Sequence, residues 1–96
     1  MVIEVLRFRL AAGVGDAAFL DADRRVQTEL VPNQTGFLRR TTARSDDGEW
    51  LVLTLWASAG EADASAAASV EHPAGMAFVA SVDGATAEER RYATLD

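Results

Sequence analysis

Three groups of side chains in this 96-residue chain have types that could support chemistry. His72 is the single histidine, and its imidazole could act as a general base near neutral pH. Arg7 and Arg9 are permanent cations that could hold an anionic or enolate-like group. Trp50 and Trp56 could stack on a flat ligand. Together these side chains would suit a flat, anionic small molecule.

Each group also has a structural interpretation. The two arginines could pair with acidic residues of neighbouring strands, which are Glu4, Glu88 and Glu89. His72 precedes Pro73 at an expected helix break, where a histidine commonly caps the helix or lies on the surface. The two tryptophans could be core residues of a dimer. The side chain of Tyr92 could face either a cavity or solvent, because the alternation of its strand does not decide between them.

Composition excludes several classes of function. The chain has nine basic and fifteen acidic residues, a net charge of −6 and a pI of about 4.6, so we expect no nucleic-acid partner. It has no cysteine, and one histidine cannot form a multi-histidine metal site within one subunit. No apolar run approaches the roughly 18 residues of a membrane span. Charged residues interrupt the first apolar run, unlike a signal peptide, and we expect a cytoplasmic protein without a membrane partner.

Residues 1–96 are expected to form a single domain with alternating strands and helices. Ser45-Asp-Asp-Gly48 has the composition of a hairpin loop. Ser58 and Glu61 fit a capping box at the start of a helix. The expected elements are a strand over 2–10, a helix from 16 to Pro32, strands over 36–44 and 50–56, a helix over 61–70 that restarts at Pro73, and a strand over 86–95.

This order predicts an α+β fold of the ferredoxin-like βαββαβ type. Right-handed crossovers place the first and third strands at the centre of a four-stranded antiparallel sheet, with two helices on one face. A sheet of this kind leaves its second face uncovered.

The strand over 50–56 is apolar on both of its faces. We expect one face, with Leu51, Leu53 and Leu55, to pack against the helices beside Leu6, Phe8 and Leu10. The opposite face would then carry a mixed set of side chains: Val5, Arg7, Arg9, Trp50, Val52, Thr54 and Trp56. Because a monomer rarely exposes such a patch, we expect a homodimer that pairs through this face. A cavity between the two sheets would be lined by the same set.

Three short motifs resemble the antibiotic-biosynthesis-monooxygenase-like branch of the dimeric α+β barrel superfamily. They are Leu53-Thr-Leu-Trp-Ala-Ser58 before an acidic, alanine-rich helix, Thr35-Gly-Phe37 at the start of a strand, and Arg7-Phe-Arg-Leu10 with the turn that ends at Gly15. The resemblance implies a dimeric α+β barrel. It also implies oxidation of aromatic, quinol-like substrates by O2 with neither metal nor flavin, so no cofactor is expected. Trp56 matches the tryptophan of the family's cavity.

The chain departs from the family at other positions. Val52 occupies the place of the asparagine of the quinol-oxidising members, Ala62 that of a tyrosine, and Met76 falls near a basic residue. The asparagine, tryptophan and histidine of the haem-degrading members are absent from the matching positions. Three hypotheses remain: a cofactor-independent monooxygenase, a ligand-binding dimer without chemistry that takes a small aromatic or anionic compound, and a purely structural dimer.

Overall fold

Four antiparallel strands form one sheet in the order β2-β3-β1-β4. The structure is a computed structural model that describes residues 1–95. The strands are β1 (Val2–Phe8), β2 (Phe37–Arg44), β3 (Trp50–Trp56) and β4 (Glu88–Ala93). The helices are α1 (Asp16–Arg25), α2 (Ala59–Ser69) and α3 (Pro73–Ser81), and two 3-10 turns cover Val31–Asn33 and Gly84–Thr86. A π-helical turn, Val26–Leu30, continues α1.

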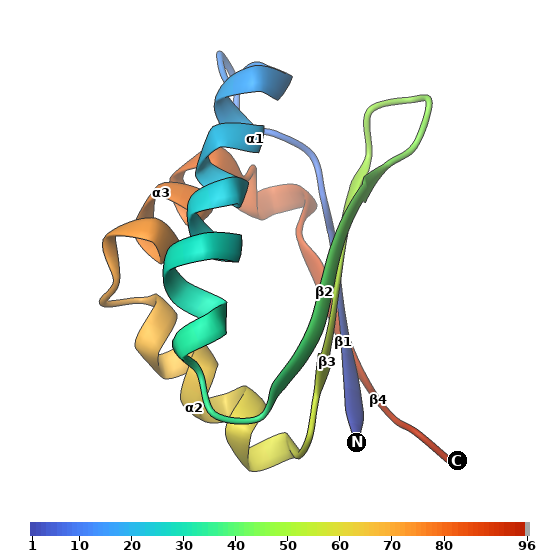
Figure 1. Cartoon of the computed structure of the whole chain (residues 1–96). Helices are drawn as coiled ribbons and strands as arrows, with labels where there is room; N and C mark the ends of the chain where they lie inside the picture. The colour runs from blue at the N-terminus through green and yellow to red at the C-terminus, as the bar shows by residue number, and fades with distance from the viewer. Residues whose placement is uncertain (96) are drawn as a thin grey trace.

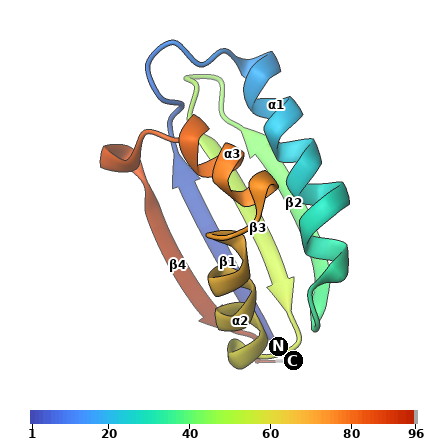
Figure 2. The same cartoon turned by 90° about the vertical axis from the view of Figure 1, so that its left-hand side faces the viewer.

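All three α-helices lie on one face of the sheet, and the other face is bare (Figure 1). Seen from the helical side, α1 runs along the β2 edge, whereas α2 and α3 cross in front of the central strands (Figure 2). β1 pairs with both β3 and β4, and β2 pairs with β3. This confirms the βαββαβ ferredoxin-like fold, with the first and third strands at the centre.

Local sequence signals set the helix boundaries. The Ser58 hydroxyl accepts a hydrogen bond of 3.3 Å from the backbone N–H of Glu61, which is one half of the predicted capping box; the return bond, from the N–H of Ser58 to the Glu61 carboxylate, is not observed within the described residues. His72 caps α3, because its Nδ1 accepts a bond of 3.0 Å from the N–H of Ala74. Pro73 occupies the first turn of α3, where its missing N–H has no helical partner to lose. The expected break and restart at Pro73 is therefore confirmed.

The orientation of β3 is the opposite of the one that we expected from sequence. The side chains of Trp50, Val52, Thr54 and Trp56 are buried toward the helices, and the leucines between them are half-buried on the bare face. The neighbouring strand fixes this orientation, since Phe8 lies opposite Trp50 and Leu6 opposite Val52. The prediction that the tryptophans share a face with Arg7 and Val5 is wrong.

Side-chain volume agrees with this orientation. Near Trp56 the helical layer presents small residues, among them Ala62, Ser65 and Ala66, which line the same cavity as the indole. Near Trp50 it presents Phe19, whose ring packs 4.7 Å from the indole. Both large indoles thus have room on the helical side of the sheet.

The core consists of two clusters, both on the helical side. The first contains Phe8, Phe19, Trp50 and Val52; the second contains Val26, Leu30, Val31 and Ala74. Phe78 of α3 packs against both clusters. The α2–α3 contact is close as well: a Cβ atom on Gly75 would lie 2.1 Å from the backbone oxygen of Ser69, so only glycine fits there.

Within residues 1–95, no helix is both long enough and apolar enough to cross a lipid bilayer.

Candidate functional site

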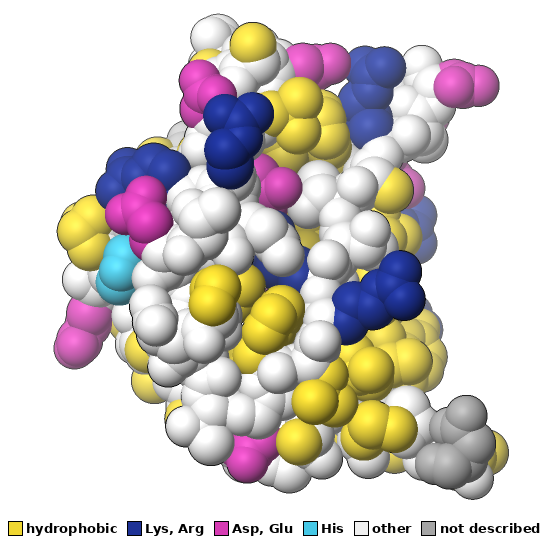
Figure 3. All heavy atoms as spheres, viewed as in Figure 1, with side chains coloured by type: hydrophobic (Ala, Val, Ile, Leu, Met, Phe, Trp, Pro, Cys, Tyr) yellow, Lys and Arg dark blue, Asp and Glu magenta, His cyan; other side chains and the backbone are white. Residues whose placement is uncertain are grey.

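A cavity of about 280 Å³ lies between the sheet and the helical layer of the single chain. Its walls are mostly apolar and come from both layers, including Leu6, Val52, Trp56, Val26, Leu30 and Phe78. Hydrophobic side chains reach the surface where the helices meet the sheet (Figure 3). Ligand sites of proteins are typically concave and apolar with a few polar groups, and this cavity has that character.

The cavity brings together part of the predicted site. Val52, Thr54 and Trp56 line it, because they are on the helical face of β3. Trp50 is on the same face but does not line the cavity; its ring packs 4.7 Å from that of Phe19 in the first core cluster. The cavity wall around Trp56 is thus formed by a single chain, whereas we expected a cavity between the two sheets of a dimer.

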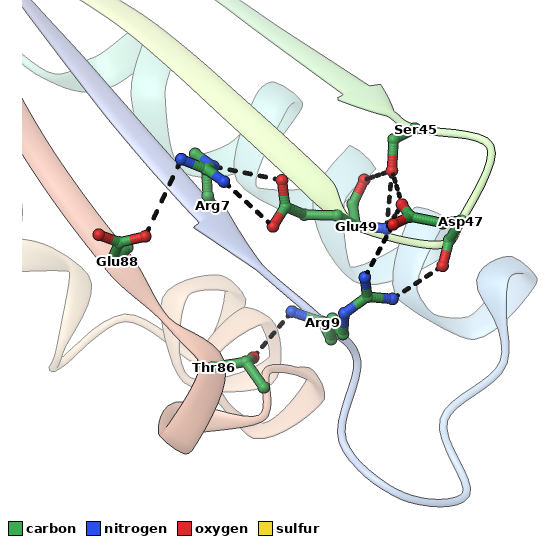
Figure 4. A network of polar contacts seen from close by, with 7 residues as sticks. All are labelled: Arg7, Arg9, Ser45, Asp47, Glu49, Thr86 and Glu88. Atoms are coloured by element: carbon green, nitrogen blue, oxygen red, sulfur yellow. Dashed lines mark hydrogen bonds and ion pairs between the residues drawn. The ribbon is translucent and has the colours of Figure 1, made fainter.

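Arg7, Arg9 and Tyr92 lie outside this cavity. Arg7 and Tyr92 flank a second hollow, on the bare face of the sheet, together with Val5, Glu88 and Arg90. The side chain of Arg7 bonds to Glu49 at 3.2 Å and lies 3.9 Å from Glu88 (Figure 4). The hydrogen bond and charge of Glu49 raise the pKa of Arg7, so its guanidinium stays charged. A role of Arg7 and Tyr92 in ligand binding stays a prediction, and it would concern a site on the bare face of the sheet.

Arg9 is held at the β2–β3 hairpin. Its guanidinium donates to the backbone oxygen of Asp47 at 2.8 Å and to the Asp47 carboxylate at 3.2 Å (Figure 4). The expected structural role of both arginines, ion pairing, is therefore observed, although Glu49 and Asp47 are the main partners. His72 does not line the cavity either, because its ring caps α3.

Sequence reasoning missed the cation in the cavity wall. The side chain of Arg40 on β2 lines the cavity and is only 4% exposed. Its Nη2 atom lies 2.7 Å from Oδ1 of Asp23 on α1, and the Thr42 hydroxyl donates to Oδ2 of the same carboxylate at 2.8 Å. A buried charge costs several kcal/mol unless it is paired, and Asp23 is the pairing charge.

Two wall carboxylates, Glu4 of β1 and Glu89 of β4, were expected only as partners of the arginines. Burial and the neighbouring Glu4 raise the pKa of Glu89. Glu4 is itself held at 2.9 Å by Arg91, which also binds Asp63 of α2 at 2.8 Å. With its raised pKa, the Glu89 carboxyl can hold a proton at higher pH than an ordinary glutamate, and this is useful for proton transfer.

The raised pKa of Glu89 predicts a pH-dependent stability. The native state binds the Glu89 proton more tightly than the unfolded chain does. The stabilisation that this proton gives is therefore complete below pH 4.5, the ordinary pKa of glutamate, and is lost as the pH rises through the raised pKa of Glu89. Arg91 opposes the shift but does not reverse it. Glu89→Gln should therefore be more stable than the parent at pH 7 and gain nothing at pH 4, as measured by urea unfolding. An equal difference at both values would contradict this.

Two buried polar atoms near the start of α2 have no hydrogen-bond partner within residues 1–95. They are Nε1 of Trp56 and Oε2 of Glu61. Glu61 lies against Gly36, where a Cβ atom would collide with its carboxylate. Unpaired buried groups are uncommon in folded proteins and often belong to sites of function.

Comparison with known proteins identifies the fold. No family model and no curated protein sequence matches the chain. Among solved structures, SnoaB of Streptomyces nogalater, described as a cofactor-independent oxygenase, is similar with a TM-score of 0.81 at 22% identity, covering 99% of this chain and 93% of SnoaB. A Nitrosomonas europaea protein assigned to the antibiotic biosynthesis monooxygenases gives a TM-score of 0.75 at 14% identity, with 100% of both chains covered.

A third similar structure is a MhuD variant with two manganese protoporphyrin IX molecules in each active site. Its TM-score is 0.68 at 21% identity, and the match covers 99% of this chain and 95% of MhuD. The chain therefore has the fold of the antibiotic-biosynthesis-monooxygenase-like proteins across nearly its whole length. Within residues 1–95 no group of three potential metal ligands comes together.

Proposed function

We propose that this chain binds a flat aromatic, quinol-like molecule in the cavity between its sheet and helices and oxidises it with O2. The observation that carries the proposal is the position of Trp56, whose indole forms part of the wall of a mostly apolar cavity. An aromatic ring can stack on or pack edge-on against an indole there. The likeness to SnoaB, described as a cofactor-independent oxygenase, supports this reaction class.

The reaction needs no external reductant when the substrate carries an activated CH2 group, as anthrone does. Loss of a proton gives an enolate, and O2 then accepts four electrons: one oxygen atom becomes the new C=O, and the other leaves as water. In this proposal the wall carboxylate of Glu89 accepts the proton, since its raised pKa makes it a stronger base than an ordinary glutamate. The apolar walls exclude water from the enolate.

Anthrone therefore provides the test of the proposed function. The protein should consume one O2 for each anthrone and produce anthraquinone faster than buffer alone does. Saturable quenching of tryptophan fluorescence without oxygen uptake would leave the alternative, a binding protein without chemistry. Neither quenching nor uptake would leave the second alternative, a purely structural protein.

The two tryptophans supply a matched pair of variants. Trp56→Phe should weaken anthrone binding at least about tenfold, because it removes ring area from the cavity wall. Trp50→Phe should leave the affinity unchanged, since Trp50 does not line the cavity. In Trp50→Phe the remaining indole is Trp56, so its fluorescence reports binding directly. Equal losses in the two variants would contradict the placement of the ligand.

We also propose that the chain forms a homodimer through the bare sheet face. This face carries half-buried apolar side chains that the helices do not cover: Ile3, Val5, Leu51, Leu53 and Leu55. Ion pairs of Arg7 with Glu49 and Glu88 lie at its margin. An apolar patch with a charged rim is typical of an interface, and a second copy of the same sheet would cover it.

Leu53→Glu tests the dimer. The charge would lie at the centre of the paired sheets without a partner, so light scattering should return about twice 10.3 kDa for the parent and about 10.3 kDa for the variant. Met76→Glu is the matched control, because Met76 is 57% exposed on α3 and distant from the bare face. A monomeric parent at micromolar concentration would contradict the proposal.

A further inference from the structure

Arg40 is the most buried arginine of the ion pairs in the described residues, and it forms part of a largely apolar cavity whose other charged wall residues are Glu4 and Glu89. Its side chain is 4% exposed, and that of Asp23 is 12% exposed. Burying such a pair yields little or no stability compared with apolar residues of the same volume. A stability role alone therefore gives no reason for a guanidinium at this position.

Part of the hydrogen-bonding capacity of Arg40 is not used by its neighbours. Nη1 donates to the side chain of Gln27 at 3.1 Å and weakly to that of Thr42 at 3.5 Å. Nη2 lies 2.7 Å from Oδ1 of Asp23, the distance of a charge-assisted ion pair. Asp23 thus balances the charge of Arg40, and no hydrogen bond from Nε is observed within residues 1–95. Because arginine carries five donors, the guanidinium can still donate to a ligand in the cavity.

The guanidinium is held in place on several sides. Gln27 of the π-helical turn binds its edge, the ring of Phe78 lies 5.6 Å from its central carbon, and Asp23 is fixed by Thr42. A cation held in this way loses little conformational entropy when it binds a ligand.

We propose that Arg40 is the anion-binding residue of the cavity, and that the ligand is a flat aromatic molecule with an ionised oxygen, such as a phenolate, enolate or carboxylate. The inference rests on the proposed function, because it uses the same cavity. The oxygen would accept from the N–H groups of Arg40 that Asp23 and Gln27 leave available, and the ring would extend along the apolar wall toward Trp56. Asp23 is a positioning residue that keeps the guanidinium in the wall.

The test compares two probes of the same shape, 2-naphthoate and 2-naphthamide, at pH 7. Both are measured in the Trp50→Phe background, where quenching reports on Trp56. A charge-assisted hydrogen bond is worth enough to favour naphthoate at least about tenfold over the neutral amide. This first measurement needs no change at Arg40 and so does not depend on the folding of a variant there.

Variants of Arg40 and Asp23 then test whether Arg40 causes the preference for naphthoate over naphthamide. Asp23→Asn keeps Arg40 charged and removes its counter-charge, so the preference for naphthoate should persist or increase. Adding Arg40→Met to Asp23→Asn removes both charges together and should abolish the preference while naphthamide still binds. Arg40→Lys keeps the positive charge but not the planar guanidinium, so it should retain part of the preference for naphthoate. Circular dichroism and thermal unfolding establish that each variant is folded.

Two results would overturn the inference. One is equal affinity of the parent for both probes, in which case the cavity proposal survives without an anion site. The other is an undiminished preference for naphthoate in Asp23→Asn/Arg40→Met, which would place the anion elsewhere. If neither probe binds, the inference fails, and the anthrone assay decides separately whether the proposed function stands.

Discussion

Asp23→Ala should lower the free energy of unfolding by about 3–5 kcal/mol. The substitution leaves the Arg40 guanidinium in a wall where its side chain is 4% exposed, without the carboxylate that lies 2.7 Å away. It also removes the acceptor of the Thr42 hydroxyl. The cost is therefore that of an uncompensated buried cation, which is larger than that of a lost surface ion pair.

The double variant Asp23→Leu/Arg40→Met provides the comparison. It removes both charges and replaces them with apolar side chains, so its stability should be close to that of the parent or above it. Urea unfolding of the parent, of Asp23→Ala and of the double variant measures the three free energies. A double variant as unstable as the single one would show that the loss comes from packing and not from the unpaired charge.

Phe19→Ala should also cost about 3–5 kcal/mol, for a different reason. Phe19 is completely buried on α1, and its ring contacts three others, at 5.5 Å from Phe8, 4.7 Å from Trp50 and 5.5 Å from Phe78. Truncation to alanine leaves a cavity that rings fixed on two strands and a helix cannot easily fill.

The adjacent residue is the control for Phe19. Leu20 is 42% exposed on the same helix, and Leu20→Ala should change stability by no more than about 0.5 kcal/mol. Denaturant unfolding gives both values, and near-ultraviolet circular dichroism of Trp50 should weaken only in Phe19→Ala. Similar losses in the two variants would mean that α1 is stabilised by its helical propensity rather than by its contact with the sheet.

The topology could be predicted because its signals are local. The hairpin loop over 45–48, the Ser58 cap and the break at Pro73 each fix the end of an element through the backbone conformation or hydrogen bond of a few residues. With the order of elements known, the handedness of the crossovers leaves few ways to arrange the sheet.

The orientation of β3 could not be predicted from its alternation, because both faces are apolar. Leucines and tryptophans are equally compatible with a core, so period-two spacing does not distinguish them. The deciding signal was elsewhere in the chain, in the pairing of β3 with β1, which places Trp50 opposite Phe8 and Val52 opposite Leu6. The helical layer agrees with this orientation, because Ala62 leaves space beside Trp56 and Phe19 packs against Trp50.

Arg40 was missed for a related reason. Phe37 faces the helices beside Trp56, so strict alternation would turn Arg39 inward and Arg40 outward. The strand is irregular between Phe37 and Arg39, and this shift turns Arg40 inward beside Thr54. A bulge adds one residue to a strand and leaves little trace in composition. The cation of the site therefore depends on a feature that residue types alone do not show.

The π-helical turn after α1 has an evolutionary consequence. Val26 and Leu30 of this turn line the cavity, and a π turn is a backbone feature that is wider than an α-helical one. The width of the cavity on this side is thus determined by the path of the main chain, whereas its charge is determined by side chains elsewhere in the wall, those of Arg40, Glu4 and Glu89. Point substitutions and single-residue insertions can then alter polarity and size independently, so descendants of this chain could acquire new ligands one property at a time.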